Sequence, residues 1–248
     1  MKLTELIDYT GRLLQVARWR DYCPNGLQVQ GRPEVMRVVS GVTASKQLLE
    51  AALEANADLV LVHHGYFWKN EDPRILGIKR DRLKFLLQHD LNLAAYHLPL
   101  DAHPELGNNA QLARLLGFDI EGWFGEQPVA AYGRWREAAG LDALGRRVEQ
   151  ILGRTPLMVG EPDQPVRRIA WCSGAAQDSL QQAVELGVDA FLTGEISEHT
   201  VHLARESGVA FIAAGHHATE RFGVRALGDH LAEQFGLTHQ FIDLYNPV

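Results

Sequence analysis

Residues 37–64 read RVVSGVTASKQLLEAALEANADLVLVHH, and residues 168–195 read RIAWCSGAAQDSLQQAVELGVDAFLTGE. The two stretches align without a gap, which places Asp58 on Asp189 and Leu61 on Leu192. In each stretch two short apolar runs flank a segment whose apolar residues recur with helical spacing. The pattern predicts strand, helix and strand, and the short apolar runs are typical of strands that are covered on both faces.

A second pair of segments repeats in the same order. Residues 91–97 (LNLAAYH) align with residues 210–216 (AFIAAGH), so that His97 falls on His216 and Asp101 on Glu220. Two matches in one order indicate an internal duplication. We therefore predict an α/β protein with two pseudo-symmetric lobes and largely parallel sheets. The first lobe is expected at residues 1–120 and the second at 168–248. Residues 121–167, rich in Gly and Pro, are expected to form an inter-lobe connection with one helix near 141–152.

The composition excludes several classes of protein. The formal charge of −7 disfavours a surface built mainly for nucleic acid. No apolar stretch approaches the roughly 18 residues that a membrane-spanning helix needs. The first residues are partly acidic, which is unlike a signal peptide. The only two cysteines, Cys23 and Cys172, suit a reducing compartment. We expect a cytoplasmic protein with no membrane association.

Histidines and carboxylates follow the predicted strands. His63-His64 ends one strand, His97 precedes Asp101, and His216 precedes Glu220 by one helical turn. The carboxyl ends of parallel strands form the usual functional crevice of an α/β fold. The predicted metal ligands are His63, His64, Asp101, His216 and Glu220. Five ligands are too many for one four-coordinate ion and too few to saturate two, as a two-metal site with open positions requires.

Within this set Glu220 is the expected bridging carboxylate, and His97 is expected to support the ligands from behind as a second-shell residue. The nitrogen and oxygen ligands fit two divalent ions per subunit but do not distinguish zinc, manganese, iron, cobalt and nickel. His103 and His217 are weaker candidates. Five further histidines are expected to lie on the surface or to be hydrogen-bonded elsewhere: His89, His199, His202, His230 and His239.

Three other segments have structural explanations. Residues 22–29 (YCPNGLQV) contain an Asn-Gly turn before a strand, and Asn108-Asn109 resembles a turn and helix N-cap. The basic stretch between Lys69 and Lys84 predicts a solvated helix face, although it could also hold a phosphate group.

Four motifs together carry a resemblance to a known family. They are YCPNGLQV at 22–29, VHHG at 62–65, HLPLD at 97–101 and GHHATE at 215–220. In this order they resemble the GTP cyclohydrolase 1 type 2 homologs, also called the Ngg-one-interacting-factor-three-like family, in its short bacterial form. The resemblance implies a dinuclear metal site between two α/β lobes, with all five ligand positions matched. It also implies a toroidal homohexamer whose sites face an internal cavity.

Two functions from different classes remain open. The first is a metal-dependent hydrolase that attacks an amidine-like carbon or a phosphoryl centre of a small molecule, such as a nucleotide. Basic residues of the 69–84 stretch, with Arg221 and Arg225, would then hold its anionic groups. The alternative is a non-catalytic metal-binding assembly or scaffold protein, which binds other proteins or acts in the DNA-damage response. Direct binding of nucleic acid is disfavoured by the net charge.

Overall fold

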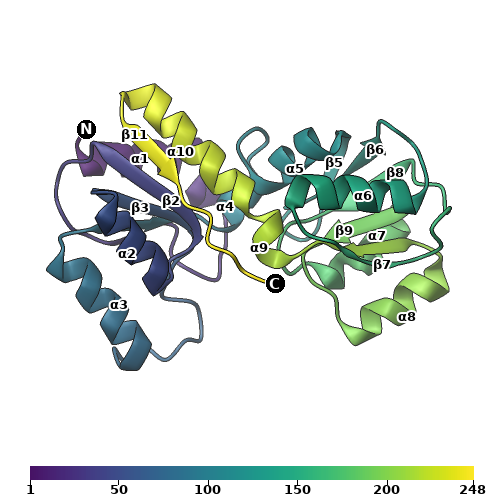
Figure 1. The fold of residues 1–248 in the computed structure, drawn as a ribbon, viewed down its shortest axis with the longest axis horizontal. Helices are drawn as coiled ribbons and strands as arrows, with labels where there is room; N and C mark the ends of the chain where they lie inside the picture. The colour runs from purple at the N-terminus through teal and green to yellow at the C-terminus, as the bar shows by residue number, and fades with distance from the viewer. The chain divides into compact units, whose positions relative to one another are not determined.

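The computed structural model describes residues 1–248 as two compact units, each built on one β-sheet (Figure 1). The first unit comprises Met1–Leu100 and Gly223–Tyr245, and the second comprises Asp101–Phe222 and Asn246–Val248. The chain changes unit at three points, and two of them lie within helices. The first is α4 (Leu98–Asp101), and the other is α10 (Arg221–Phe235).

The first unit has a five-stranded sheet in the order β1-β4-β3-β2-β11. Its other elements are, in chain order, α1 (Leu3–Leu13), η1 (Val16–Arg18), β1 (Gly26–Val29), β2 (Arg37–Thr43), α2 (Lys46–Glu54), β3 (Leu59–His64), α3 (Gly77–Gln88), β4 (Asn92–Ala95) and β11 (Thr238–Phe241). All neighbouring strands are parallel except β1, which runs antiparallel to β4. This sheet carries the His63-His64 pair at the end of β3.

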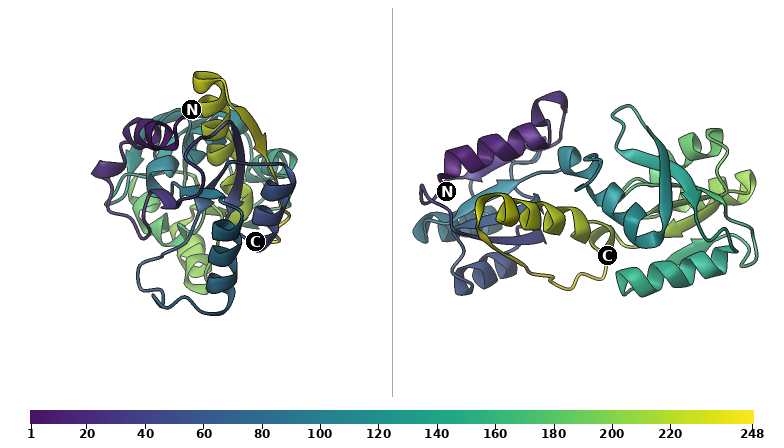
Figure 2. Two further views of the ribbon diagram at one scale, coloured as in Figure 1. Left: turned by 90° about the vertical axis from the view of Figure 1, so that its left-hand side faces the viewer. Right: turned by 90° about the horizontal axis from the view of Figure 1, so that it is seen from above.

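Helices cover both faces of the first sheet. On one face, buried residues of α2 and α3, such as Leu49 and Leu86, join Val60 of β3 in one apolar cluster. On the other face α1 and α10 lie side by side, where Tyr9 and His230 are hydrogen-bonded at 2.8 Å (Figure 2). The central strands are therefore buried on both sides, as their short apolar runs predict.

The second unit has a six-stranded sheet in the order β5-β6-β8-β9-β10-β7. Its elements are α5 (Asn108–Leu116), β5 (Phe118–Phe124), β6 (Ala130–Trp135), α6 (Leu141–Leu152), β7 (Leu157–Val159), β8 (Arg168–Trp171), η2 (Gln177–Ser179), α7 (Leu180–Glu185), β9 (Ala190–Thr193), α8 (Glu198–Ser207), β10 (Ala210–Ala213) and α9 (His216–Thr219). Alternate residues of its strands face two separate apolar clusters. Leu192 packs with the α5 and α6 side, and Phe191 packs with the α7 and α8 side.

The two sheets share the topology that the sequence repeat predicts. The parallel strands β4-β3-β2 correspond to β10-β9-β8, and an antiparallel edge strand, β1 or β7, lies next to β4 or β10. Asp58 and Asp189, identical in the repeat, have the same role. Each carboxylate accepts the backbone N–H of the first residue of the preceding strand, Arg37 at 2.9 Å and Arg168 at 2.8 Å. The carboxylate thereby fixes where each strand begins.

The units divide the chain differently from the expected lobes at 1–120 and 168–248. Residues 121–167 are not a connection, because they contribute β6, β7, α6 and most of β5 to the second unit. The second unit also begins earlier, at Asp101, and the C-terminal β11 returns to the first sheet beside β2. The glycines of residues 121–167 that suggested a linker lie within the second unit. In β6, Gly133 lets the backbone of Asp119 approach where a side chain would collide with it.

None of the helices combines the length and the apolar composition that would let it cross a bilayer. Cys23 and Cys172 are both buried free thiols.

Candidate metal centre

Three imidazoles gather in the first unit, and we call them the histidine cluster: His63, His64 and His97. The ring centroids of His63 and His64 lie 4.7 Å apart, and that of His97 lies 5.1 Å from His63 and 5.7 Å from His64. Ligand-capable nitrogens of all three lie within 4.8 Å of one another. His63 and His64 end β3, and His97 follows the neighbouring strand β4. The histidine cluster is thus positioned to hold a metal ion.

His63 is held in the tautomer that a metal ligand needs. The residue is fully buried, and its Nδ1 lies 2.9 Å from the backbone carbonyl oxygen of Tyr96. A carbonyl oxygen can only accept, so Nδ1 carries the proton and Nε2 keeps the lone pair. His64 is oriented by a different strand, because its Nδ1 lies 3.2 Å from Oγ1 of Thr43 on β2. Hydrogen bonds of this kind fix the ring orientation of metal-binding histidines.

His97 is bound to a carboxylate from the segment before β1. Its Nδ1 lies 2.7 Å from Oδ1 of Asp21. Burial alone would raise the pKa of Asp21, but hydrogen bonds from His97, Asn25 and Tyr22 lower it below its ordinary value. Asn25 binds both partners, since its Nδ2 donates to Asp21 at 2.8 Å and its Oδ1 accepts the His97 N–H at 2.7 Å. The YCPNG segment, which bends at Tyr22 and Cys23 and enters β1 at Gly26, therefore supports the histidine cluster.

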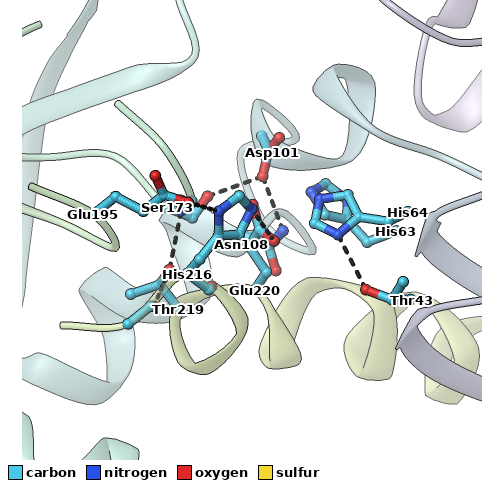
Figure 3. A network of polar contacts seen from close by, with 12 residues as sticks. Thr43, His63, His64, Asp101, Asn108, Ser173, Glu195, His216, Thr219 and Glu220 are labelled. Atoms are coloured by element: carbon cyan, nitrogen blue, oxygen red, sulfur yellow. Dashed lines mark hydrogen bonds and ion pairs between the residues drawn. The ribbon is translucent and has the colours of Figure 1, made fainter. Parts of the chain in front are cut away.

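The second unit contains the remaining three predicted ligands, Asp101, His216 and Glu220, which we call the carboxylate cluster. Asp101 ends α4 and is almost fully buried. Its Oδ1 accepts hydrogen bonds from Asn108 Nδ2 and Ser173 Oγ, both at 2.9 Å (Figure 3). These two donors fix the orientation of the carboxylate, as partners of metal ligands do.

His216 lies between two carboxylates. Its Nδ1 is 2.6 Å from Oε1 of Glu195, and its Nε2 is 3.2 Å from Oε2 of Glu220. Burial alone would lower the pKa of His216, but the hydrogen bonds and charges of Glu220 and Glu195 outweigh burial and raise it to about 9. In the metal-free protein, the protonated ring of His216 can interact with the carboxylates of both Glu195 and Glu220. A cation between Nε2 and Glu220 would replace that proton.

Tight backbone turns bring the carboxylate cluster together. Gly215, with φ of 98°, ends the segment after β10 and lets α9 begin at His216, so that His216 and Glu220 meet one turn apart. Gly174, with φ of 68°, lies against both side chains, and a methyl group there would collide with Glu220. The Gly174 N–H donates to Thr219 Oγ1 at 3.0 Å, which ties the loop after β8 to α9.

The other polar residues considered from the sequence have partners elsewhere. His199, His202, His230 and His239 bind the side chains of Asp178, Glu198, Tyr9 and Ser40, respectively. His103 Nδ1 accepts the backbone N–H of Leu106 at 3.0 Å and stabilises a turn. In the basic stretch 69–84, three of the cations pair with nearby acids: Arg74 with Asp72, Lys79 with Glu71 and Arg80 with Asp81.

Sequence reasoning missed the residues that hold the ligands in place. Asp21, Asn108, Ser173 and Glu195 each bind a predicted ligand or His97. Only Glu195 had a signal in the sequence, because the repeat places it at the position of His64. The predicted helix N-cap role of Asn108 is not what its side chain does, since α5 begins without a side-chain cap and Asn108 binds Asp101 instead.

Both clusters fit divalent transition metals by the chemistry of their atoms. Each offers only nitrogen and oxygen, which suits zinc, manganese, iron, cobalt or nickel. In both His63 and His216, Nδ1 is hydrogen-bonded to an acceptor oxygen. Nε2 is therefore the nitrogen that is left to face an ion. Of the two buried thiols, Cys172 belongs to no such group, whereas the sulfur of Cys23 lies within 4.8 Å of ligand atoms of Asp21 and His97. Burial and the charges of Asp101 and Glu220 raise the pKa of Cys172, so its sulfur stays protonated.

Comparison with known proteins gives consistent results along the whole chain. The chain is 58% identical to the GTP cyclohydrolase 1 type 2 homolog of Pseudomonas aeruginosa, over 99% of this chain and 98% of the relative. It is 52% identical to the protein of the same name from Escherichia coli K12, over 100% of both chains.

Solved structures agree with the fold. The protein ybgI, described as of unknown function, superposes with a TM-score of 0.97 at 52% identity over 100% of both chains. TTHA1606 from Thermus thermophilus superposes with a TM-score of 0.90 at 36% identity, also over 100% of both. The model of the Duf34/NIF3 (NGG1p interacting factor 3) family matches residues 1–247. With histidines and carboxylates in three of the four motifs and relatives along its entire length, the chain belongs to the Duf34/NIF3 family.

Proposed function

We propose that this protein binds two divalent metal ions per subunit and acts as a metal-dependent hydrolase. In this proposal His63 and His64 of the first unit and Asp101, His216 and Glu220 of the second share one dinuclear site. The observation that carries it is the pair of preset imidazoles. His63 and His216 each have Nδ1 engaged by an acceptor, which presents Nε2 to a metal.

The donor count supports two ions and open positions. Five ligand side chains do not saturate two ions, and a carboxylate such as Glu220 can bridge them. Divalent ions in such a site supply Lewis acidity and lower the pKa of water to near neutrality. The protein's own groups fix the ligands, as Ser173 and Asn108 do for Asp101 and as Glu195 does for His216. His97, held by Asp21, is proposed to support the histidine cluster rather than to bind the ions.

The substrate class is inferred from the relatives' name and from the chemistry of the site. Proteins named GTP cyclohydrolase 1 type 2 homolog are 52–58% identical to this chain. We propose a nucleotide-like substrate whose amidine-like carbon or phosphoryl centre is attacked by water. Ring opening of GTP is the first reaction to test.

The test combines metal analysis with a substrate panel. Protein supplied with each candidate metal in turn is incubated with GTP, other nucleotides, cyclic amides and phosphoesters. We expect bound metal and hydrolysis of at least one compound, with both reduced in His63→Ala and Glu220→Ala. His199→Ala is the matched control, because His199 is exposed and paired with Asp178. Turnover that survives His63→Ala and Glu220→Ala would contradict the assignment.

A non-catalytic scaffold is the second candidate, and an exposed apolar surface favours it. Ile75, Leu76 and Ile78 expose 56%, 61% and 72% of their surface at the start of α3. Such clusters often mark protein–protein contacts. We propose a second copy of the chain as the first partner to test, within a toroidal hexamer. Light scattering should show an oligomer that Ile78→Glu disrupts. Tight metal binding with no turnover, together with an intact oligomer, would favour the scaffold over the hydrolase.

A further inference from the structure

The first unit contains a hollow that is separate from the histidine cluster. It measures about 620 Å³ and lies between α1, η1 and the start of β1. This volume falls within the range of about 300–1,000 Å³ that is typical of small-molecule sites. Its wall is formed largely by apolar groups, among them Ile7, Gly11, Val16 and the ring of Tyr96. A ligand of the size of a small aromatic or short-chain compound would fit.

The charged residues around the hollow are mainly cationic. Arg12 of α1 and Arg18 of η1 both line it, against a single carboxylate from Asp8. Arg18 also donates a hydrogen bond to the side chain of Gln15, which keeps its guanidinium at the hollow. Two guanidinium groups beside an apolar wall favour an anionic group on a largely apolar molecule.

Tyr96 takes part in the wall of the hollow through its ring, because its hydroxyl is buried. Tyr96 is only 1% exposed, and its hydroxyl is buried beside the hydroxyl of Thr10. The nearby Thr10 donates its own proton to the Leu6 carbonyl at 2.8 Å. A hydroxyl that donates can still accept, so the Thr10 oxygen is available to the Tyr96 proton. Burial raises the pKa of Tyr96 far above its ordinary value, which keeps the proton on this oxygen.

We propose that this hollow binds a small molecule with an apolar body and one anionic group, and that its occupancy is sensed by the histidine cluster. The anionic group would pair with Arg12 and Arg18, and the apolar body would lie against Ile7, Val16 and the ring of Tyr96. This site is distinct from the proposed metal-binding residues.

The link to the histidine cluster runs through two residues of the wall. The Tyr96 carbonyl oxygen accepts the His63 Nδ1 proton at 2.9 Å. Asn25 also lines the hollow, and its amide binds Asp21 at 2.8 Å and the His97 N–H at 2.7 Å. A ligand that shifts Tyr96 or Asn25 therefore changes the hydrogen bonds that orient both imidazoles.

The test uses full-length, metal-free protein, so that its outcome does not depend on the proposed hydrolase. The probe is 1-anilinonaphthalene-8-sulfonate, an aromatic sulfonate, and the comparison is N-phenyl-1-naphthylamine, which lacks the charge. We expect saturable binding of the sulfonate at one site, with affinity for the neutral probe lower by about tenfold or more. Equal affinities would overturn the anionic component, and non-saturable binding would overturn the site.

Gly11 supplies a matched pair of variants. A β-carbon at Gly11 meets nothing within 4 Å, so Gly11→Ala fits α1 without a clash, and Gly11→Phe places a larger side chain at the same position of the wall. Gly11→Phe should fill the hollow and weaken sulfonate binding about tenfold or more, whereas Gly11→Ala should stay within about twofold of the parent. Removing both guanidinium groups, in Arg12→Gln with Arg18→Gln, should remove the preference for the charged probe. Unchanged binding in Gly11→Phe would place the probe elsewhere and refute the proposal.

Imidazole resonances test the link to the cluster. In protein labelled with ¹⁵N-histidine, signals are assigned with His63→Gln and His97→Gln. The sulfonate should shift the signals of His63 and His97 in the parent protein and leave them in place in Gly11→Phe. Saturable binding without any shift of these signals would refute the coupling.

Discussion

His216 should make the stability of the metal-free protein depend on pH in the weakly alkaline range. Its pKa is raised from 6.5 to about 9 in the folded protein, because Glu220 and Glu195 outweigh the opposing effect of burial. At 1.36 kcal/mol per pKa unit, this shift corresponds to at most about 3 kcal/mol of stabilisation. A raised pKa stabilises the fold fully below pH 6.5, and the contribution is lost as the pH rises through 9.

The assay is urea unfolding followed by tryptophan fluorescence, in a chelator and at pH values from about 6 to about 9.5. The free energy of unfolding should fall across this range by up to about 3 kcal/mol more in the parent than in His216→Gln. Glu195→Gln should retain part of the dependence with a lower midpoint, since Glu220 still faces Nε2. Equal pH dependence in the parent and His216→Gln would refute the reasoning.

Three further substitutions test the supporting structure. Asp21→Asn removes the carboxylate that holds His97, and it should weaken metal binding about 10-fold to 100-fold by calorimetric titration; unchanged affinity would show that Asp21 has no such role. Gly174→Ala adds a methyl group at positive φ beside the carboxylate cluster, and should destabilise the protein by about 1–3 kcal/mol in urea unfolding; stability equal to the parent would contradict the steric argument. Ser40→Ala removes the partner of the buried His239 Nε2, 2.7 Å away, and should cost about 1–3 kcal/mol; a loss well below this would show that water replaces the hydroxyl.

The periodic parts of the fold were predictable from the sequence. The apolar runs at 59–62 and 190–192 form β3 and β9, and the helix expected near 141–152 is α6. These elements follow local patterns that a short window contains. The antiparallel hairpin of β5 and β6 was not predicted, because its strands alternate little and contain Gly122 and Gly133 at points of close approach. Strand pairing there depends on neighbours and not on local pattern.

The candidate site divides in the same way. Histidines at strand ends can be identified in the sequence, because a polar residue directly after an apolar run is predicted to lie at the functional edge of the sheet. The residues that orient them are not, since Asp21 binds His97 across 76 residues and Ser173 binds Asp101 across 72. Those contacts follow from the three-dimensional register alone. The role of Glu195 was within reach, because the repeat places it where the first copy has His64.

The return of β11 to the first sheet has a consequence for how the protein is made. β11 pairs with β2, so Thr238 lies beside Arg37, and the second unit occupies nearly all of the chain between β4 and α10. A ribosome completes nearly all of the second unit before it releases the strand that finishes the first. The second unit can therefore fold while the first sheet still lacks its edge strand β11. Until β11 is synthesised, the edge of β2 remains unpaired. Removing β11 by truncation would therefore destabilise the sheet of the first unit more than that of the second unit.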